Sequence, residues 1–248
     1  PTSGDAKIFG KDCIKFGPEI RQDIGYLPSE VFYYDRMKVL DLLKYSASFY
    51  NRDCTKRMYE LAEIMELDLK RRIDDLSYGN KKKVGIVQGL LHSPKLIILD
   101  EPTAGVDIEI RRSMWDFLSE INEQGTTIIL TTHYLEEAEN LCRNIAIIDH
   151  GQIMENTSMK KLLGQLNMET FILDTREEIT SAPEIDGYSL QKIDTHTLAV
   201  DVAKEKGLNN LFTRLSDHGL TILSLRNKTN RLEELFMDMV NENKTANV

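Results

Sequence analysis

Two continuous apolar runs constrain the fold of this chain more than any other feature: "KLIILD" at residues 95–100 and "TTIILTTH" at residues 126–133. Runs of this kind are typical of strands that are covered on both faces of a parallel sheet. Between them lies an amphipathic helical pattern that ends at Gly125. Its apolar positions are Ile110, Met114, Phe117, Leu118 and Ile121. Strands and helices that alternate in this way predict an α/β fold with a parallel sheet flanked by helices.

The part of the chain before these runs adds a strand and several helices. "DIGYLP" at residues 23–28 predicts a buried strand that stops at its proline. Apolar residues then recur at helical spacing over Met37–Tyr50 and Thr55–Leu67. We therefore expect a helical subdomain at about residues 35–93, inserted into the α/β core.

The character of the sequence changes after about Leu166. "TFILDT", "TLAVDV" and "LTILSLR" predict strands, "GLNNLFTRLSDHG" predicts a helix, and "RLEELFMDMVNEN" predicts a final helix. The apolar stripe of this final helix (Leu232, Phe236 and Met239) is expected to belong to its own domain's core. The expected organisation is a core over residues 1–160 and a small α+β domain over residues 165–248.

Composition excludes several classes of protein. The 31 basic and 40 acidic residues give a net charge of −9, which argues against nucleic acid as a partner. The three cysteines are far apart and form no C-x-x-C motif, so neither a disulfide framework nor a zinc site is indicated, and a reducing cytosol fits. No apolar run approaches the roughly 20 residues that span a bilayer, so a membrane role would require a separate partner chain.

Two adjacent acids follow the first apolar run, in "LIILDEPTAGVD". The end of such a strand lies in the crevice where open α/β sheets bind ligands. Neighbouring strand residues point to opposite sides, so the two acids serve different purposes. Asp100 can face a Mg²⁺ ion, and Glu101 can act as a general base on a water molecule. The alternative, an acid pair that only caps the next helix, does not account for "PTAGVD".

Two further positions suit an anionic ligand. His133 ends the second apolar run, where an imidazole can hydrogen-bond a phosphate. The alternative there is an ordinary surface or core histidine with no functional role. Ser77 and Gly79 in "LSYGN" lie at the start of a predicted helix, where N–H groups and the helix dipole favour an anion. Ser77 also suits an N-cap. The lysines at 81–83 either add to the positive field or form a solvated face.

Taken together, "LSYGNKKKVGIVQGLL", "LIILDEPTAGVD" and "TTIILTTH" resemble the ATPase subunit of ABC transporters, in particular the subunits of ABC-2 type exporters. The resemblance is strong over residues 1–160 and weaker after 165. It implies a P-loop NTPase-like parallel sheet with an inserted helical subdomain. By this resemblance Asp100 is the Walker B aspartate that holds Mg²⁺ through water, Glu101 the catalytic glutamate and His133 the switch histidine.

The resemblance also implies an assembly. Ser77 and Gly79 match the signature residues that touch the γ-phosphate of ATP bound to the opposite subunit, and Asp107 matches the D-loop aspartate at the dimer interface. The implied active unit is a head-to-tail dimer with a second ATPase subunit. Its implied place is the cytoplasmic face of the membrane, as a peripheral protein bound to a transmembrane permease subunit. The run "VFYYD" and the helices at 37–67 would form the permease-facing surface, with core packing as the alternative for that run.

Three departures from the family pattern favour another interpretation. Ser29 stands where the family has the Q-loop glutamine, and Tyr78 and Asn80 replace a glycine and a glutamine of the signature. No G-x-x-x-x-G-K-[ST] motif, the Walker A loop that cradles phosphates, occurs in these 248 residues. In the family this loop lies a few dozen residues before "PTSG". We expect this chain by itself to bind ATP weakly and to be inactive.

Three functions therefore remain to be compared. The first is an ATP hydrolase that uses ATP and Mg²⁺ to drive export through a membrane partner. The second is a non-catalytic or regulatory ABC-ATPase-like module. The third is a soluble relative that acts in DNA repair or on the ribosome, which lacks support because the chain has neither long coiled coils nor a second copy of the core.

Overall fold

The computed structural model of the chain describes residues 2–34, 36–165, 168–203, 205–228, 232–233 and 235–236. Its contacts divide the chain into two units, Pro1–His133 and Tyr134–Val248. This division differs from the predicted boundary at 160–165, which stays a prediction. Among the described residues, no helix combines the length and apolarity needed to cross a bilayer.

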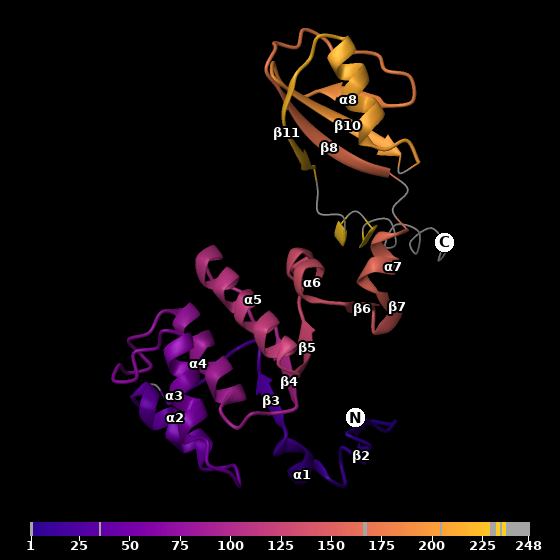
Figure 1. The fold of residues 1–248 in the computed structure, drawn as a ribbon. Helices are drawn as coiled ribbons and strands as arrows, with labels where there is room; N and C mark the ends of the chain where they lie inside the picture. Colours follow the sequence, from indigo (N-terminus) through magenta and orange to yellow (C-terminus); the bar gives the residue numbers. More distant parts are fainter. Residues whose placement is uncertain are drawn as a thin grey trace. The chain divides into compact units, whose positions relative to one another are not determined.

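The first unit is built on a parallel sheet, as predicted. Its strands β3 (Ile24–Leu27), β4 (Leu96–Asp100) and β5 (Thr127–Thr131) lie side by side in that order (Figure 1). All three strands run in the same direction, and β4 and β5 are in register from their first residue to their last. Their carboxyl ends therefore meet at one edge of the sheet, and β3 stops directly before Pro28.

The two apolar runs are not equally buried. Leu96, Ile97 and Leu99 of β4 are buried, as expected for a strand covered on both faces. The side chains of β5 are exposed or half-buried, and Ile129 is 51% exposed. The prediction was wrong for β5: among the described residues, neither face of this strand is fully covered.

Three helices lie between β3 and β4, over the span where a helical subdomain was predicted: α2 (Val39–Ala47), α3 (Thr55–Ile64) and α4 (Tyr78–Leu90). Helix α4 packs against β3 and contacts both α2 and α3. It is buried on nearly all sides: Val84 and Val87 are fully buried, as is Leu91 at its C-cap. The sheet, α2 and α3 thus pack around α4, which explains why most of its residues are buried.

The remaining elements of the first unit are short, apart from α5. Helix α5 (Ile108–Glu123) buries Met114, Phe117, Leu118 and Ile121 along one face, as predicted. A hairpin of β1 (Lys7–Ile8) and β2 (Lys11–Asp12) precedes α1 (Gly17–Arg21).

The second unit contains two hydrophobic cores. The first core belongs to α6 (Leu135–Leu141), the hairpin of β6 (Asn144–Asp149) and β7 (Gln152–Ser158), and α7 (Met159–Leu163). The hairpin turns at His150 and Gly151, whose φ angles are 45° and 77°, as a two-residue turn of this kind requires.

Leu232 and Leu235 pack into this first core, next to Met159 and Leu162. The expectation that the Leu232/Phe236/Met239 stripe belongs to the core of a separate 165–248 domain was therefore wrong for Leu232, and Phe236 also packs here. Met239 lies outside the described residues. Helical spacing identifies an apolar face but says nothing of which neighbour covers it.

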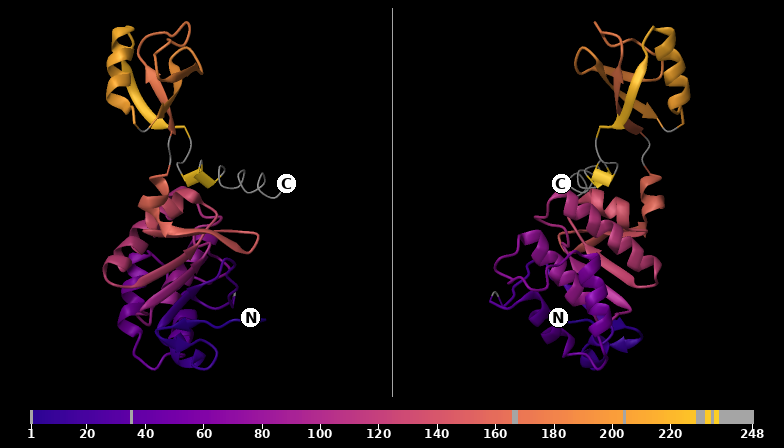
Figure 2. Two further views of the ribbon diagram at one scale, coloured as in Figure 1. Left: turned by 90° about the vertical axis from the view of Figure 1, so that its right-hand side faces the viewer. Right: turned by 60° about the vertical axis from the view of Figure 1, so that its left-hand side comes forward.

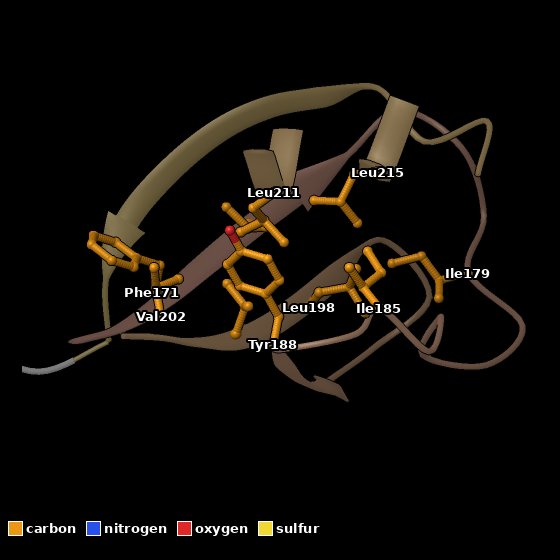
Figure 3. Close-up of a cluster of buried hydrophobic side chains, with 10 residues drawn as sticks. Phe171, Ile179, Ile185, Tyr188, Leu198, Val202, Leu211 and Leu215 are labelled. Atoms are coloured by element: carbon orange, nitrogen blue, oxygen red, sulfur yellow. The ribbon is translucent and has the colours of Figure 1, made fainter. Parts of the chain in front are cut away.

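The second core lies under an antiparallel sheet with the strand order β11-β8-β10-β9. The strands are β8 (Met168–Thr175), β9 (Ser189–Lys192), β10 (Thr197–Ala203) and β11 (Ile222–Asn227), and helix α8 (Leu208–Asp217) lies across one face, as two further views show (Figure 2). Leu211 and Leu215 of α8 point at Leu198 of β10 and at Tyr188 (Figure 3). The α+β character predicted for this part is present, although β9 was not predicted.

Candidate functional site

The carboxyl ends of β4 and β5 bring the two predicted acids next to a threonine. Asp100 pairs with Thr131 across the ladder, and the Thr131 hydroxyl donates a short hydrogen bond to Oδ1 of Asp100. Asp100 is half-buried at the end of its strand. Because parallel strands end at the same edge, strand pairing alone places this carboxylate beside the next strand's polar end.

Glu101 leaves the strand in a strained backbone conformation. Its φ angle is +48°, in the left-handed region that non-glycine residues rarely adopt. A residue held there costs of order 1–3 kcal/mol, and such residues cluster at functional sites. Hydrogen bonds at both ends hold it: the Glu101 N–H donates to the Thr131 carbonyl at 3.0 Å, and the Ala104 N–H donates to the Glu101 carbonyl at 3.3 Å.

The Glu101 carboxylate faces the predicted switch histidine. Nδ1 of His133 lies 2.8 Å from Oε2 of Glu101, and the side chains are 64% and 24% exposed, respectively. Oε2 is buried and has no well-directed hydrogen bond within the described residues, so this contact is chiefly one of charge when the imidazole is protonated. The structure thus brings together Asp100, Glu101 and His133, three groups suited to phosphate chemistry.

Ser77, Gly79 and Asp107 form a second group, at the starts of α4 and α5. Ser77 is the N-cap of α4, as predicted, and its hydroxyl accepts the Asn80 N–H at 3.3 Å. Asp107 is the N-cap of α5, and its Oδ1 accepts the Ile110 N–H at 3.0 Å. A β-carbon on Gly79 would lie 2.9 Å from Cδ1, the flexible end of the Ile110 side chain, so the starts of α4 and α5 lie close together at this point.

Ser29 and Tyr78, two of the departures from the family pattern, contact each other. The Tyr78 hydroxyl donates to the Ser29 carbonyl at 3.4 Å. The Tyr78 ring also lies over Gly105, whose φ is +72° and where a β-carbon would lie 3.2 Å from the ring. Tyr78 therefore packs along the loop that links the acids to α5.

Two contributing residues were missed by the sequence reasoning, Thr131 and Lys82. Lys82 is fully buried, and its ammonium group donates to the Ser29 carbonyl at 2.6 Å and to the Glu101 carbonyl at 3.1 Å. The solvated-face interpretation of lysines 81–83 is wrong for Lys82 and Lys83, both of which are buried. No local signal in "NKKK" distinguishes these two lysines from solvated ones, because their burial depends on the sheet and helices that pack around α4.

The donor set fits a magnesium ion that is bound partly by water. Within the described residues, no group of three or more His, Cys, Asp or Glu side chains is arranged to hold a metal. Mg²⁺ commonly takes one or two carboxylates, and water and substrate phosphates supply its other ligands. The Asp100 carboxylate at the strand end can provide such a contact.

Comparisons with known proteins identify the family of the chain. The family model described as "ABC transporter" matches residues 1–104. The linearmycin resistance ATP-binding protein LnrL of Bacillus subtilis is 30% identical over 250 residues, which cover 96% of this chain and 80% of that protein. Other relatives are longer: the chain spans 24% of ABC transporter G family member 23 of Dictyostelium discoideum, with 36% identity over 168 residues.

Two solved structures have a similar fold. One is described as the ATP-binding subunit of an ABC transporter, with a TM-score of 0.61 and 26% identity over 66% of this chain and 71% of that one. The other is the ATP-binding cassette MJ0796, a dimer bound to ADP and Pi, with a TM-score of 0.58 and 21% identity over 64% of this chain and 75% of that one. These neighbours confirm the predicted P-loop NTPase-like fold. The chain belongs to the family of ABC transporter ATP-binding proteins.

Proposed function

We propose that this chain is the ATP-hydrolysing subunit of an exporter, which couples ATP binding and hydrolysis to transport through a separate transmembrane permease subunit. The observation that carries the proposal is the contact between the Glu101 carboxylate and the His133 imidazole beside Asp100. A cap role does not explain Glu101, because Asp107 is the residue that caps the following helix. The acid pair is therefore available for chemistry.

In the proposed reaction, water attacks the γ-phosphate of ATP in line with the leaving group. Glu101 orients this water and accepts its proton, and His133 donates a hydrogen bond to the γ-phosphate. Asp100 would hold Mg²⁺ through water, and the ion would neutralise charge on the β- and γ-phosphates. The close Glu101–His133 contact keeps both groups pointed at one place before substrate arrives.

The second group of residues supports a head-to-tail dimer. Ser77 and Gly79 lie at the start of α4, where N–H groups and the helix dipole suit an anion. Asp107 lies at the start of α5 and is exposed. We propose that this surface meets ATP bound to a second ATPase subunit, with Asp107 at the interface. The solved MJ0796 structure, described as dimeric, shows that a chain of this fold can pair.

An aromatic groove in the first unit is the proposed permease-facing surface. It has a volume of about 430 Å³ and lies between the loop after β3, helix α2 and helix α4. Its aromatic lining consists of Tyr26, Phe32, Tyr33, Tyr34, Tyr45, Phe49 and Tyr50. Phe32 and Tyr34 are 87% and 62% exposed, so plain core packing does not describe them. Exposed aromatic patches of this kind mark protein interfaces, and a permease partner would place the subunit at the cytoplasmic face of the membrane.

A non-catalytic or regulatory module is the second candidate. Ser29, Tyr78 and Asn80 favour it, as does the lack of a G-x-x-x-x-G-K-[ST] motif in these 248 residues. The sequence of the gene upstream of the codon for Pro1 separates the two. A phosphate-binding loop there supports hydrolysis, and its absence together with undetectable ATP binding supports the module.

The test of hydrolysis is Glu101→Gln in the full-length protein. The variant should bind ATP with unchanged affinity and lose turnover, since the amide keeps the shape of the side chain but cannot accept the proton. Glu109→Gln, an exposed acid in the first turn of α5, is the matched control and should hydrolyse ATP normally. Normal turnover in Glu101→Gln would refute the assignment of the base.

The test of the partner surface is Phe32→Ala combined with Tyr34→Ala. Both side chains are exposed, so the double variant should fold and hydrolyse ATP as before but fail to co-purify with a co-expressed transmembrane permease subunit. Ile14→Ala, which removes an equally exposed apolar side chain elsewhere, should co-purify normally. Retained co-purification of the double variant would rule out the aromatic groove.

A further inference from the structure

Lys82 of α4 is a lysine with no exposed surface at all. To bury an ammonium ion costs several kcal/mol unless its hydrogen-bonding groups are satisfied. The ammonium group has three N–H donors and no acceptor. A buried lysine on a helix next to the proposed base therefore requires a specific reason.

The ammonium group of Lys82 reaches three backbone carbonyl groups. It donates to Ser29 at 2.6 Å, to Glu101 at 3.1 Å and to Pro28 at 3.4 Å. Pro28 and Ser29 form the turn directly after β3, and Glu101 directly follows β4. A single side chain thus joins α4 to the ends of two neighbouring strands.

The Glu101 carbonyl is the contact with a mechanical consequence. Glu101 has a φ of +48°, which an unrestrained glutamate would not keep. Its N–H is held by the Thr131 carbonyl, and its carbonyl is held by Lys82 and by the Ala104 N–H. If the Lys82 contact is lost, one of the bonds that hold this conformation is lost, and the carboxylate loses its fixed direction toward His133.

We propose that Lys82 is a positioning residue for the proposed hydrolysis: it holds the Glu101 and Ser29 carbonyl groups to α4 and so aims the general base. The Tyr78 hydroxyl, which also donates to the Ser29 carbonyl, adds a second connection to the same turn. Helix α4 begins at the residues proposed to face the partner subunit's ATP. This inference rests on the proposed function.

The first test is Lys82→Met in the full-length protein, which keeps the length and apolar stem of the side chain and removes the donors. We expect kcat for ATP hydrolysis to fall about 10- to 100-fold, the range that a misplaced catalytic group causes, with KM for ATP changed less than about threefold. If Lys82 only stabilised the fold, Lys82→Met would instead give less folded enzyme, and the folded fraction would keep the wild-type kcat and KM.

Arg52→Met is the matched control. Arg52 also donates to backbone carbonyls of other elements, to His92 at 3.1 Å and to Gln22 at 3.2 Å, but not to Glu101 or Ser29. It should destabilise the protein and leave kcat per folded molecule unchanged. Equal kcat values per folded molecule in the two variants would overturn the proposal.

A nucleotide-free measurement separates this inference from the proposed function. Hydrogen exchange of backbone amides should be faster in Lys82→Met than in wild type over residues 29–34 and 101–105, and unchanged in Arg52→Met there. Unchanged exchange would overturn the positioning role even if Glu101→Gln abolishes turnover. If Lys82→Met does not fold, Tyr78→Phe decides: faster exchange over residues 29–34 with a lower kcat supports the proposal, and wild-type values for both overturn it.

Discussion

Gly25 of β3 lies so close to Gly89 of α4 that a β-carbon on Gly25 would sit 2.1 Å from the Gly89 carbonyl oxygen. The same β-carbon would be 3.2 Å from Cγ1 of Ile97 on the neighbouring strand. Strand and helix therefore pack backbone against backbone at this point. This contact brings α4 close to the sheet, and with it the Lys82 side chain that reaches Glu101.

Gly25→Ala should destabilise the protein by about 3 kcal/mol, since the added methyl group meets rigid backbone in a packed core. Gly89→Ala is the matched control, because its β-carbon would find ordinary contacts at 3.5 Å. Alanine is also a better helix former than glycine, so Gly89→Ala should stay within about 1 kcal/mol of wild type. Urea denaturation measures both, and equal stabilities of the two variants would contradict the backbone contact.

His133→Ala should lower kcat for ATP hydrolysis about 100- to 1,000-fold, as the loss of one donor to a transition-state oxygen does. The free energy of unfolding should change little, because the imidazole is 64% exposed. His150→Asn removes a more exposed histidine, 95% exposed, in the β6–β7 turn and keeps a residue that tolerates a positive φ. Steady-state kinetics should show no effect of His150→Asn, and a similar loss in both variants would argue against a role specific to His133.

Stability should fall with acidification because of His92. This residue is buried, its ring stacks on Tyr50 at 3.7 Å, and its Nε2 lies 3.0 Å from the Ile24 carbonyl. Burial lowers the pKa of His92 from its ordinary 6.5 to about 4. The unfolded chain therefore binds a proton before the folded protein does, so the stabilisation is complete above pH 6.5 and lost as the pH falls toward 4.

We expect this loss to be about 2 kcal/mol between pH 7 and pH 4. His92→Phe keeps the stacking on Tyr50 and cannot take up a proton, so its free energy of unfolding should fall less over that range. Chemical denaturation at several pH values measures the difference between the two proteins. If the free energy of unfolding falls equally with pH in both proteins, His92 does not take up a proton on unfolding.

Asp107 has two separable roles, a helix cap and a proposed interface residue. Asp107→Ala should cost about 1 kcal/mol of stability through loss of the cap on α5. Asp107→Asn keeps an equally good cap and removes the charge, so it should be as stable as wild type.

If the carboxylate of Asp107 acts across the dimer, Asp107→Asn should weaken ATP-dependent dimerisation, which sedimentation velocity measures. Wild-type dimerisation and wild-type stability in Asp107→Asn would leave the helix cap as its single role.

The sequence by itself determined the α/β fold and the acids at the end of β4. Apolar runs of strand length, amphipathic helices between them and the motifs at their ends are local patterns, which can be recognised without knowledge of the rest of the fold. The N-cap at Ser77, the end of β3 before Pro28 and the turn at His150–Gly151 were predictable for the same reason. Each depends on the chemistry of neighbouring residues.

Only the tertiary structure decided which apolar strand is covered, which core receives Leu232, and where Lys82 lies. A run such as "TTIIL" reads alike at the edge and at the centre of a sheet, because its neighbours come from distant parts of the chain. In the same way, a lysine beside two other lysines looks solvated until the sheet and two helices close around its own helix. The charge of Lys82 is tolerated there because three carbonyl groups, from residues 19 to 54 positions away, converge on one ammonium group.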